Sequence, residues 1–172
     1  MFAFQHYGIE PDVFALAKGI ASGMPLGAMV SKHEIMSWSP GSHASTFGGN
    51  PVSCQAALAT IELLENGLTQ NAAEMGQYLI DQLRKLQETH MLIGDVREKG
   101  LMVAIKLVTD REKNTKAAAE RNEVIERAFQ KGLLLLGCGE NSVRFIPALV
   151  VSREEIDKGL SILDEVLKEV GE

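Results

Sequence analysis

Residues 11–19 read Pro11-Asp12-Val13-Phe14-Ala15-Leu16-Ala17-Lys18-Gly19, an apolar run that ends in a lysine followed by a glycine. The run from Val13 to Ala17 has the length of a buried β-strand, and the Pro-Asp pair before it is typical of a turn. Residues 19–23, Gly19-Ile20-Ala21-Ser22-Gly23, then predict a flexible loop. The segment therefore predicts a strand whose C-terminal end carries Lys18.

A lysine at the end of a strand has two interpretations. If burial removes solvent from the amine, its neutral form is favoured and can form an imine with an aldehyde. Alternatively, the Lys18 side chain extends to the surface, as lysine side chains at element ends commonly do. Because lysine is rarely buried, spacing alone favours the surface interpretation.

The next candidate is the loop Ser45-Thr46-Phe47-Gly48-Gly49, which precedes Asn50 and Pro51. Residues 27–31 predict a second short strand before it. Asn50 is a good N-cap and Pro51 suits the first helical position, so a helix should begin here and stop near Gly67. The Thr46 hydroxyl and the N–H groups of a helix N-terminus could hold a phosphate. An ordinary helix-entry loop fits this sequence equally well.

Beyond Gly67, helices and strands alternate. The predicted elements are a helix with capping-box spacing at Asn71 and Glu74, strands at 94–97 and 101–108, a helix at 115–131 that buries Val124, Ile125, Ala128 and Phe129, strands at 133–136 and 142–146 joined by the turn 137–141, and a helix capped by Ser152 and Glu155. This order predicts the α/β class. We expect residues 1–66 to be the end of a larger sheet domain and residues 67–172 to form a small α/β domain.

Arg144 is a charged residue inside the apolar strand Val143-Arg144-Phe145-Ile146. Its guanidinium offers a planar fork that fits a carboxylate. Alternation along a half-exposed strand also explains an outward-facing arginine, and spacing alone slightly favours that explanation.

Composition excludes several classes of function. A net charge of −6, with no cluster of lysine and arginine, argues against nucleic-acid binding, and no apolar stretch is long enough to cross a membrane. The only two cysteines, Cys54 and Cys138, are far apart, which favours a reducing, cytoplasmic setting. The four histidines lack metal-ligand spacing, so no metal site is expected. His90, near a helix end, is expected at the surface or beside the helix dipole.

Five segments in order carry a family resemblance: residues 8–19, 23–28, 45–51, 94–102 and 143–147. Together they resemble the class III aminotransferases, of the ornithine, 4-aminobutyrate and acetylornithine type, in the fold-type I group of pyridoxal-phosphate enzymes. The resemblance covers essentially the whole chain. It implies that residues 1–66 are the C-terminal remnant of the cofactor-binding large domain and residues 67–172 the small domain.

The resemblance also implies roles for three residues. Lys18 would hold pyridoxal 5′-phosphate as an imine and later move a proton between the substrate α-carbon and C4′ of the cofactor. Thr46 would bind the cofactor phosphate across the interface of a homodimer. Arg144 would bind the substrate carboxylate. The implied reaction is transamination between an amine, such as 4-aminobutyrate or an ornithine-like donor, and a 2-oxo acid such as 2-oxoglutarate.

One departure from the family is large, because its chains are more than twice this length. The absent part of the family pattern supplies a phosphate-binding turn, an aromatic residue stacked on the cofactor ring and an aspartate at the ring nitrogen. We therefore expect the 172-residue chain alone to be inactive. A non-catalytic interaction module and an aminomutase of the same family are the alternatives.

Overall fold

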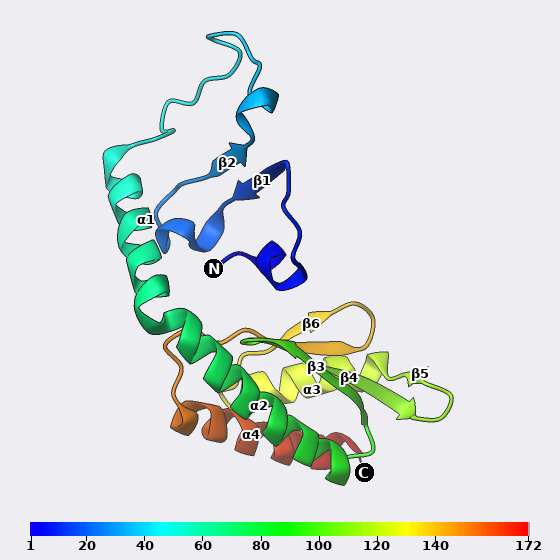
Figure 1. The fold of residues 1–172 in the computed structure, drawn as a ribbon. Coiled ribbons are helices and arrows are strands. Elements are labelled where there is room, and N and C mark those ends of the chain that lie inside the picture. Colours follow the sequence, from blue (N-terminus) through cyan, green and yellow to red (C-terminus); the bar gives the residue numbers. More distant parts are fainter. Residues whose placement is uncertain (172) are drawn as a thin grey trace. The chain divides into compact units, whose positions relative to one another are not determined.

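The computed structural model describes residues 1–171, and the chain divides into two compact units, Met1–Thr69 and Gln70–Glu172 (Figure 1). The first unit contains a two-stranded antiparallel hairpin, short helical turns and one longer helix. Its elements are the 3₁₀ helix η1 (Ala3–Tyr7), β1 (Val13–Leu16), the 3₁₀ helix η2 (Lys18–Ala21), β2 (Ala28–Ser31), the 3₁₀ helix η3 (His33–Ile35), α1 (Pro51–Leu63) and the π-helical turn η4 (Leu64–Leu68).

The hairpin confirms the two strands predicted in this unit. Val13 pairs with Ser31 at one end and Leu16 with Ala28 at the other. The flexible loop expected at residues 19–23 is wrong in its first part, since η2 occupies residues 18–21. Ala21 is fully buried there, which explains why this glycine-flanked segment has a defined helical turn.

Helix α1 begins where its sequence predicts. The Asn50 side chain accepts a hydrogen bond of 2.9 Å from the backbone N–H of Ser53, and Pro51 occupies the first helical position. At Gly67 the backbone leaves helical dihedral angles, with φ 139° and ψ −21°, a conformation that favours glycine. Helix α2 then starts two residues later, at Thr69.

The second unit is an antiparallel sheet with three helices. Its elements are α2 (Thr69–Thr89), β3 (Ile93–Lys99), β4 (Met102–Asp110), β5 (Thr115–Lys116), α3 (Ala118–Gln130), β6 (Leu136–Cys138), β7 (Ser142–Phe145) and α4 (Arg153–Gly171). The strand order is β3-β4-β7-β6, and β5 pairs with β4. No helix within residues 1–171 is long and apolar enough to span a membrane.

One hydrophobic core holds the second unit together. The helices contribute side chains such as Leu83, Val124 and Leu163, and the strands contribute Ile105 and Val143, all fully buried. Because α2, α3 and α4 share this one core with the sheet, they cover a single sheet face. At about 25 cal/mol per Å² of buried apolar surface, burial in this core is the main source of stability for the unit.

Two predicted element boundaries are wrong because strand pairing overrides the local pattern. The helix expected from Thr115 begins at Ala118, since Thr115 and Lys116 pair with β4 as β5. Phe129 on this helix is 62% exposed, not buried. The strand expected at 133–136 is shifted to Leu136–Cys138, where Gly137 pairs with Val143. A Cβ on Gly137 would meet the guanidinium of Arg121 in α3, the flexible end of a side chain that can move aside.

The two predicted capping boxes have different outcomes. Around α4 the box is confirmed, with Ser152 N–H donating to Glu155 Oε2 at 2.8 Å and Glu155 N–H donating to Ser152 Oγ at 3.3 Å. The backbone N–H of Ser152 and then its hydroxyl, which also donates to Glu155 Oε2 at 2.9 Å, lower the pKa of Glu155. For α2 the box is wrong, because Asn71 lies inside the helix and its Nδ2 donates to the carbonyl oxygen of Leu149 at 2.6 Å.

Candidate functional site

Lys18 lies directly beyond the C-terminal end of β1, as the sequence predicts. It is the first residue of η2, and its φ of 54° places it in the left-handed region, which is uncommon for a residue with a side chain. The preceding Ala17 is extended. The side chain of Lys18 is exposed, in agreement with the surface interpretation that the spacing favours and not with a buried amine. Among residues 1–171, none forms a hydrogen bond or ion pair with its amine.

The turn that carries Lys18 is attached to α1. Ser22, which ends η2, has its Oγ 3.0 Å from Thr60 Oγ1 of α1, and Ala21 is buried beside them. At the other end of the hairpin, the Lys32 amine donates to Asp12 Oδ1 at 2.7 Å. This hydrogen bond lowers the pKa of Asp12 and raises that of Lys32. The hairpin therefore presents one paired lysine and, at Lys18, one unpaired lysine.

Thr46 lies in the exposed loop that leads into α1. Two successive turns shape this loop, with Gly48 N–H donating to Ser45 O and Asn50 N–H donating to Phe47 O, each at 3.3 Å. Thr46 is exposed and belongs to no helix or strand. Its hydroxyl therefore lies four residues before Asn50, the N-cap of a 13-residue helix.

Arg144 occupies β7, where it pairs with Ala104 of β4 and Leu136 of β6. Its neighbours Val143 and Phe145 face the core, so Arg144 lies on the opposite sheet face, as alternation predicts. The arginine is half-buried, and its buried Nε–H has no hydrogen-bond partner within residues 1–171. Leaving such a group unsatisfied costs about 1–3 kcal/mol, and a carboxylate ligand would satisfy it.

Lys18 and Thr46 thus belong to the first unit and Arg144 to the second. In the described part of the chain, no hydrogen bond joins any two of the three. Their roles concern ligands and stay predictions.

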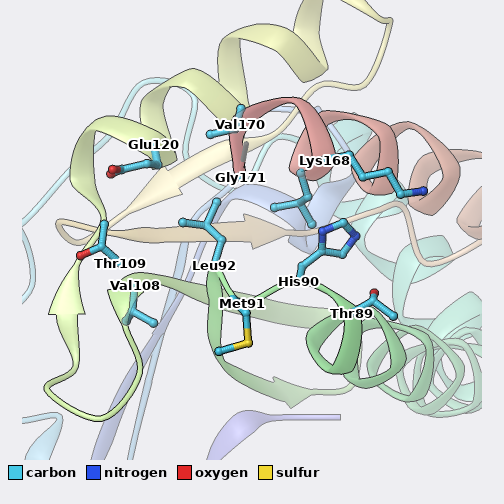
Figure 2. A pocket seen from close by; sticks show the side chains of 11 residues that line it. Thr89, His90, Met91, Leu92, Val108, Thr109, Glu120, Lys168, Val170 and Gly171 are labelled. Atoms are coloured by element: carbon cyan, nitrogen blue, oxygen red, sulfur yellow. The ribbon is translucent and has the colours of Figure 1, made fainter.

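The second unit also contains a cavity of about 520 Å³ beside the C-terminal ends of α2 and α4 (Figure 2). His90 lines it and is only 8% exposed, so the surface alternative expected for His90 is wrong, whereas its place directly after α2 fits the other alternative, beside the helix dipole. The ring Nε2 of His90 lies 2.7 Å from Asp164 Oδ1. Hydrogen bonds from Lys168 and then His90 lower the pKa of Asp164. Within residues 1–171, no group of histidine, cysteine and acidic residues is arranged to hold a metal ion.

Arg111 is a structurally important residue that the sequence reasoning missed. Its guanidinium donates to three carbonyl oxygens at the end of α2: Gln87 at 2.6 Å, His90 at 2.7 Å and Met91 at 3.1 Å. A cation is the expected partner for carbonyls at a helix C-terminus. The only sequence signal for this role of Arg111 is the absence of a capping glycine after α2.

None of the three predicted site residues lines the cavity beside the ends of α2 and α4.

Comparison with known proteins bears on the whole chain. The aminotransferase class-III family matches residues 1–167. The acetylornithine aminotransferase of Caldanaerobacter subterraneus subsp. tengcongensis is 40% identical over 171 residues, which cover 99% of this chain and 41% of the relative. The leucine/methionine racemase of Thermococcus litoralis is 41% identical, over 99% of this chain and 39% of the relative. The chain therefore spans about two fifths of the length of these relatives.

A solved transaminase structure has the same fold as this chain. An amine transaminase from an uncultivated Pseudomonas species, in its PLP-bound form, superposes with a TM-score of 0.87 and 33% identity, over 97% of this chain and 40% of that one. The predicted fold class is thus confirmed: the chain has the fold of the C-terminal part of a fold-type I transferase. With the match over residues 1–167, it follows that this chain belongs to the class III aminotransferase family.

Proposed function

We propose that this chain is the C-terminal part of a pyridoxal-phosphate-dependent enzyme that transfers an amino group from an amine to a 2-oxo acid such as 2-oxoglutarate. The observation that carries the proposal is Lys18, an exposed amine without an ion pair in residues 1–171, at the end of β1 in a chain of this family. The donor would be 4-aminobutyrate, an ornithine-like amine or a related compound. The relative named acetylornithine aminotransferase supports the ornithine-like class.

In this proposal the two parts of the chain have different tasks. Residues 1–66 form the end of the large, cofactor-binding domain, and residues 67–172 form the small domain that binds substrate. The functional enzyme is a homodimer. Cys54 and Cys138 are both free thiols, which supports the proposed cytoplasmic setting.

The donor groups of the first unit fit two parts of pyridoxal phosphate. The Lys18 amine matches the aldehyde, and the Thr46 hydroxyl, close to a helix N-terminus, matches the phosphate. When bound, the cofactor supplies an electron-withdrawing ring that stabilises negative charge on the substrate α-carbon. Thr46 would act on the phosphate bound to the partner subunit, so the site needs both copies of the chain.

Lys18 would have two tasks in turnover. Its amine would hold the cofactor at the aldehyde until the substrate amine takes its place. The free amine would then move a proton between the substrate α-carbon and C4′. An amine exposed at the start of a short helical turn has the freedom to reach both atoms.

Arg144 would fix the substrate for this proton transfer. A guanidinium can bind a carboxylate through two parallel N–H donors, which sets both position and orientation. The buried Nε–H of Arg144 has no hydrogen-bond partner within residues 1–171, which supports this role. With the carboxylate held, the α-carbon proton can be directed at the lysine.

A racemase is the second candidate, since a relative with 41% identity bears that name. Lys18, Thr46 and Arg144 would keep the same roles, but the proton would return to the substrate α-carbon instead of going to C4′. Product analysis separates the two reactions: transamination yields a 2-oxo acid, whereas racemisation yields the mirror-image amino acid. A mutase product would identify the aminomutase branch.

The first experiment asks whether Lys18 captures the cofactor. The chain is incubated with excess pyridoxal phosphate, reduced with borohydride and mapped by peptide mass spectrometry. We expect the pyridoxyl group on Lys18 and its loss in Lys18→Arg. Lys32→Arg is the matched control, because Lys32 lies in the same hairpin but is paired with Asp12. Label spread over surface lysines would favour a non-catalytic interaction module.

A second experiment allows for the missing length. The upstream part of the Caldanaerobacter relative is joined to Met1, and transamination is measured for the chimera and for the 172-residue chain alone. We expect activity only in the chimera, and a loss of at least about a thousandfold in its Lys18→Ala form, since the lysine is both cofactor anchor and base. Robust turnover by the short chain, or by the Lys18→Ala chimera, would contradict the proposal.

A further inference from the structure

The cavity beside the C-terminal ends of α2 and α4 belongs entirely to the second unit (Figure 2). The residues that line it come from the end of α2 and the segment after it, from β4, from the first turn of α3 and from the last turns of α4. Its volume of about 520 Å³ lies within the range of roughly 300–1,000 Å³ that is usual for small-molecule sites. The cavity is therefore large enough for a compact organic ligand.

The floor of the cavity is apolar. Leu92, Val108 and Leu167 line it, and the last two are only 2% and 1% exposed. The backbone N–H of Val108 donates to the carbonyl oxygen of Leu92 at 2.8 Å, which joins the segment after α2 to β4. Apolar surface of this kind favours a ligand whose body is apolar, because both are removed from water on binding.

The His90 ring offers the cavity a hydrogen-bond acceptor. Hydrogen bonds from Lys168 and then His90 lower the pKa of Asp164, so this carboxylate is ionised at neutral pH and can only accept. His90 Nε2 is therefore the donor of their 2.7 Å hydrogen bond, and Nδ1 of the neutral imidazole is an acceptor. Nδ1 has no hydrogen-bond partner within residues 1–171, although the side chain is only 7% exposed. A donor on a ligand would satisfy it.

Glu120 supplies the cavity with a negative charge that no described residue balances. It is half-buried in the first turn of α3, and its carboxylate has neither an ion pair nor a hydrogen bond within residues 1–171. Lys168 is the one lysine or arginine that lines the cavity in the described chain, and its amine already donates to Asp164 at 2.6 Å. The remaining charge favours a cationic group on the ligand.

We propose that this cavity binds a small organic cation with three parts. An amidinium or ammonium group binds Glu120, an apolar body lies over Leu92 and Val108, and a hydrogen-bond donor binds His90 Nδ1. Figure 2 shows the Leu92 side chain between Glu120 and the His90 ring, which is why the two polar groups of the ligand stand at opposite ends of its apolar body. An anion is disfavoured, because it would meet the carboxylate of Glu120.

The experiment titrates the 172-residue chain with 4-hydroxybenzamidine, whose amidinium, ring and hydroxyl match the three parts. In ¹H–¹⁵N NMR, the backbone amides of residues 89–92, 108–109 and 167–171 should shift. Two related probes each lack one part: 4-hydroxybenzamide has a neutral amide in place of the cation, and benzamidine has no hydroxyl. Each should bind about five- to tenfold more weakly, the effect of losing one charge-assisted or buried hydrogen bond.

The hydroxyl contact can be tested without replacing His90, whose bond to Asp164 joins α2 to α4. The ¹⁵N resonance of His90 Nδ1 should move on binding of 4-hydroxybenzamidine and stay in place on binding of benzamidine. Movement of this resonance with both probes, or with neither, overturns the assignment of the donor to His90.

Glu120→Gln should remove the advantage of 4-hydroxybenzamidine over 4-hydroxybenzamide, and Glu120→Lys should abolish binding of both amidines. Glu126→Gln is the matched control, because it removes the same charge from the same helix at a position that does not line the cavity. It should change each affinity less than about twofold. Equal affinity for the charged and the neutral probe, selectivity that survives Glu120→Gln, or binding that shifts none of the cavity amides overturns the proposal.

Discussion

At the C-terminal end of α2, His90 is buried because two other residues replace the solvent that a helix end normally requires. Arg111 binds the terminal carbonyl oxygens, and Asp164 of α4 binds the imidazole. The ring is thus held between two helices. A pattern of residue types cannot reveal this, since Asp164 lies 74 residues away along the chain.

Replacement of Asp164 tests this arrangement. Asp164→Asn should lower the free energy of unfolding at pH 7 by about 1–2 kcal/mol, because it removes the charge that accepts from Lys168 and His90. The folded-state pKa of Asp164 is lowered, so the stabilisation is fully present above the ordinary value of 3.8 and disappears as pH falls through the lower, folded-state value. Urea unfolding from pH 7 to pH 2 measures it.

The difference between wild type and Asp164→Asn should therefore shrink at the acid end of that range. Lys168→Met is the control, because Lys168 is the more exposed of the two partners of Asp164. It should lower the free energy of unfolding by less than about 1 kcal/mol. A difference that stayed constant down to pH 2 would show that packing, and not the carboxylate charge, is responsible.

Among the elements, α2 and the hairpin of β3 and β4 approach closely at two glycines. A Cβ on Gly76 would overlap the backbone of Gly100, which has a positive φ of 58° in the hairpin turn. The helix can therefore lie directly on the turn only where residue 76 is glycine, whereas glycine at position 100 is favoured by its positive φ. Met75 and Leu79, on either side, bury their side chains in the core.

Gly76→Ala should accordingly destabilise the protein by about 1–3 kcal/mol, since backbone atoms cannot move aside easily. Gly159→Ala is a control of opposite sign: this glycine is also inside a helix, but its nearest neighbour is Leu133 Cδ1 at 3.5 Å, an ordinary contact. There alanine should stabilise by up to about 1 kcal/mol through helix propensity. Equal effects of the two changes in urea unfolding would contradict the close approach.

How well each element could be predicted depends on how local its causes are. The start of α1 at Pro51 and the cap of α4 at Ser152 were predictable, because the partners lie three residues away. Strands β5 and β6 were not, because pairing with β4 and β7 determines them. For the site, Lys18 after β1 and the outward face of Arg144 follow from local pattern. The register that pairs Arg144 with Ala104 depends on tertiary structure.

For the molecule as a whole, the two units differ in how much they bury. In residues 1–69, all described, three residues are buried: Ala21, Ser53 and Ala57. The second unit has a continuous core that includes fully buried Leu83, Ile105 and other large side chains. Amides open at a free energy that follows the buried apolar contacts around them, so the units should differ in hydrogen exchange.

We expect the slowest-exchanging amides of the 172-residue chain to lie in β3, β4, β7 and the helices that cover them, with protection that falls in parallel as urea is added. Amides of β1, β2 and α1 should exchange much faster, because Ser53, with its unpartnered hydroxyl, and two alanines are the only buried side chains among residues 1–69. Hydrogen exchange followed by mass spectrometry provides the measurement. Equal protection in the two units, with one common urea dependence, would mean that residues 1–69 are stabilised cooperatively with the second unit despite burying so little.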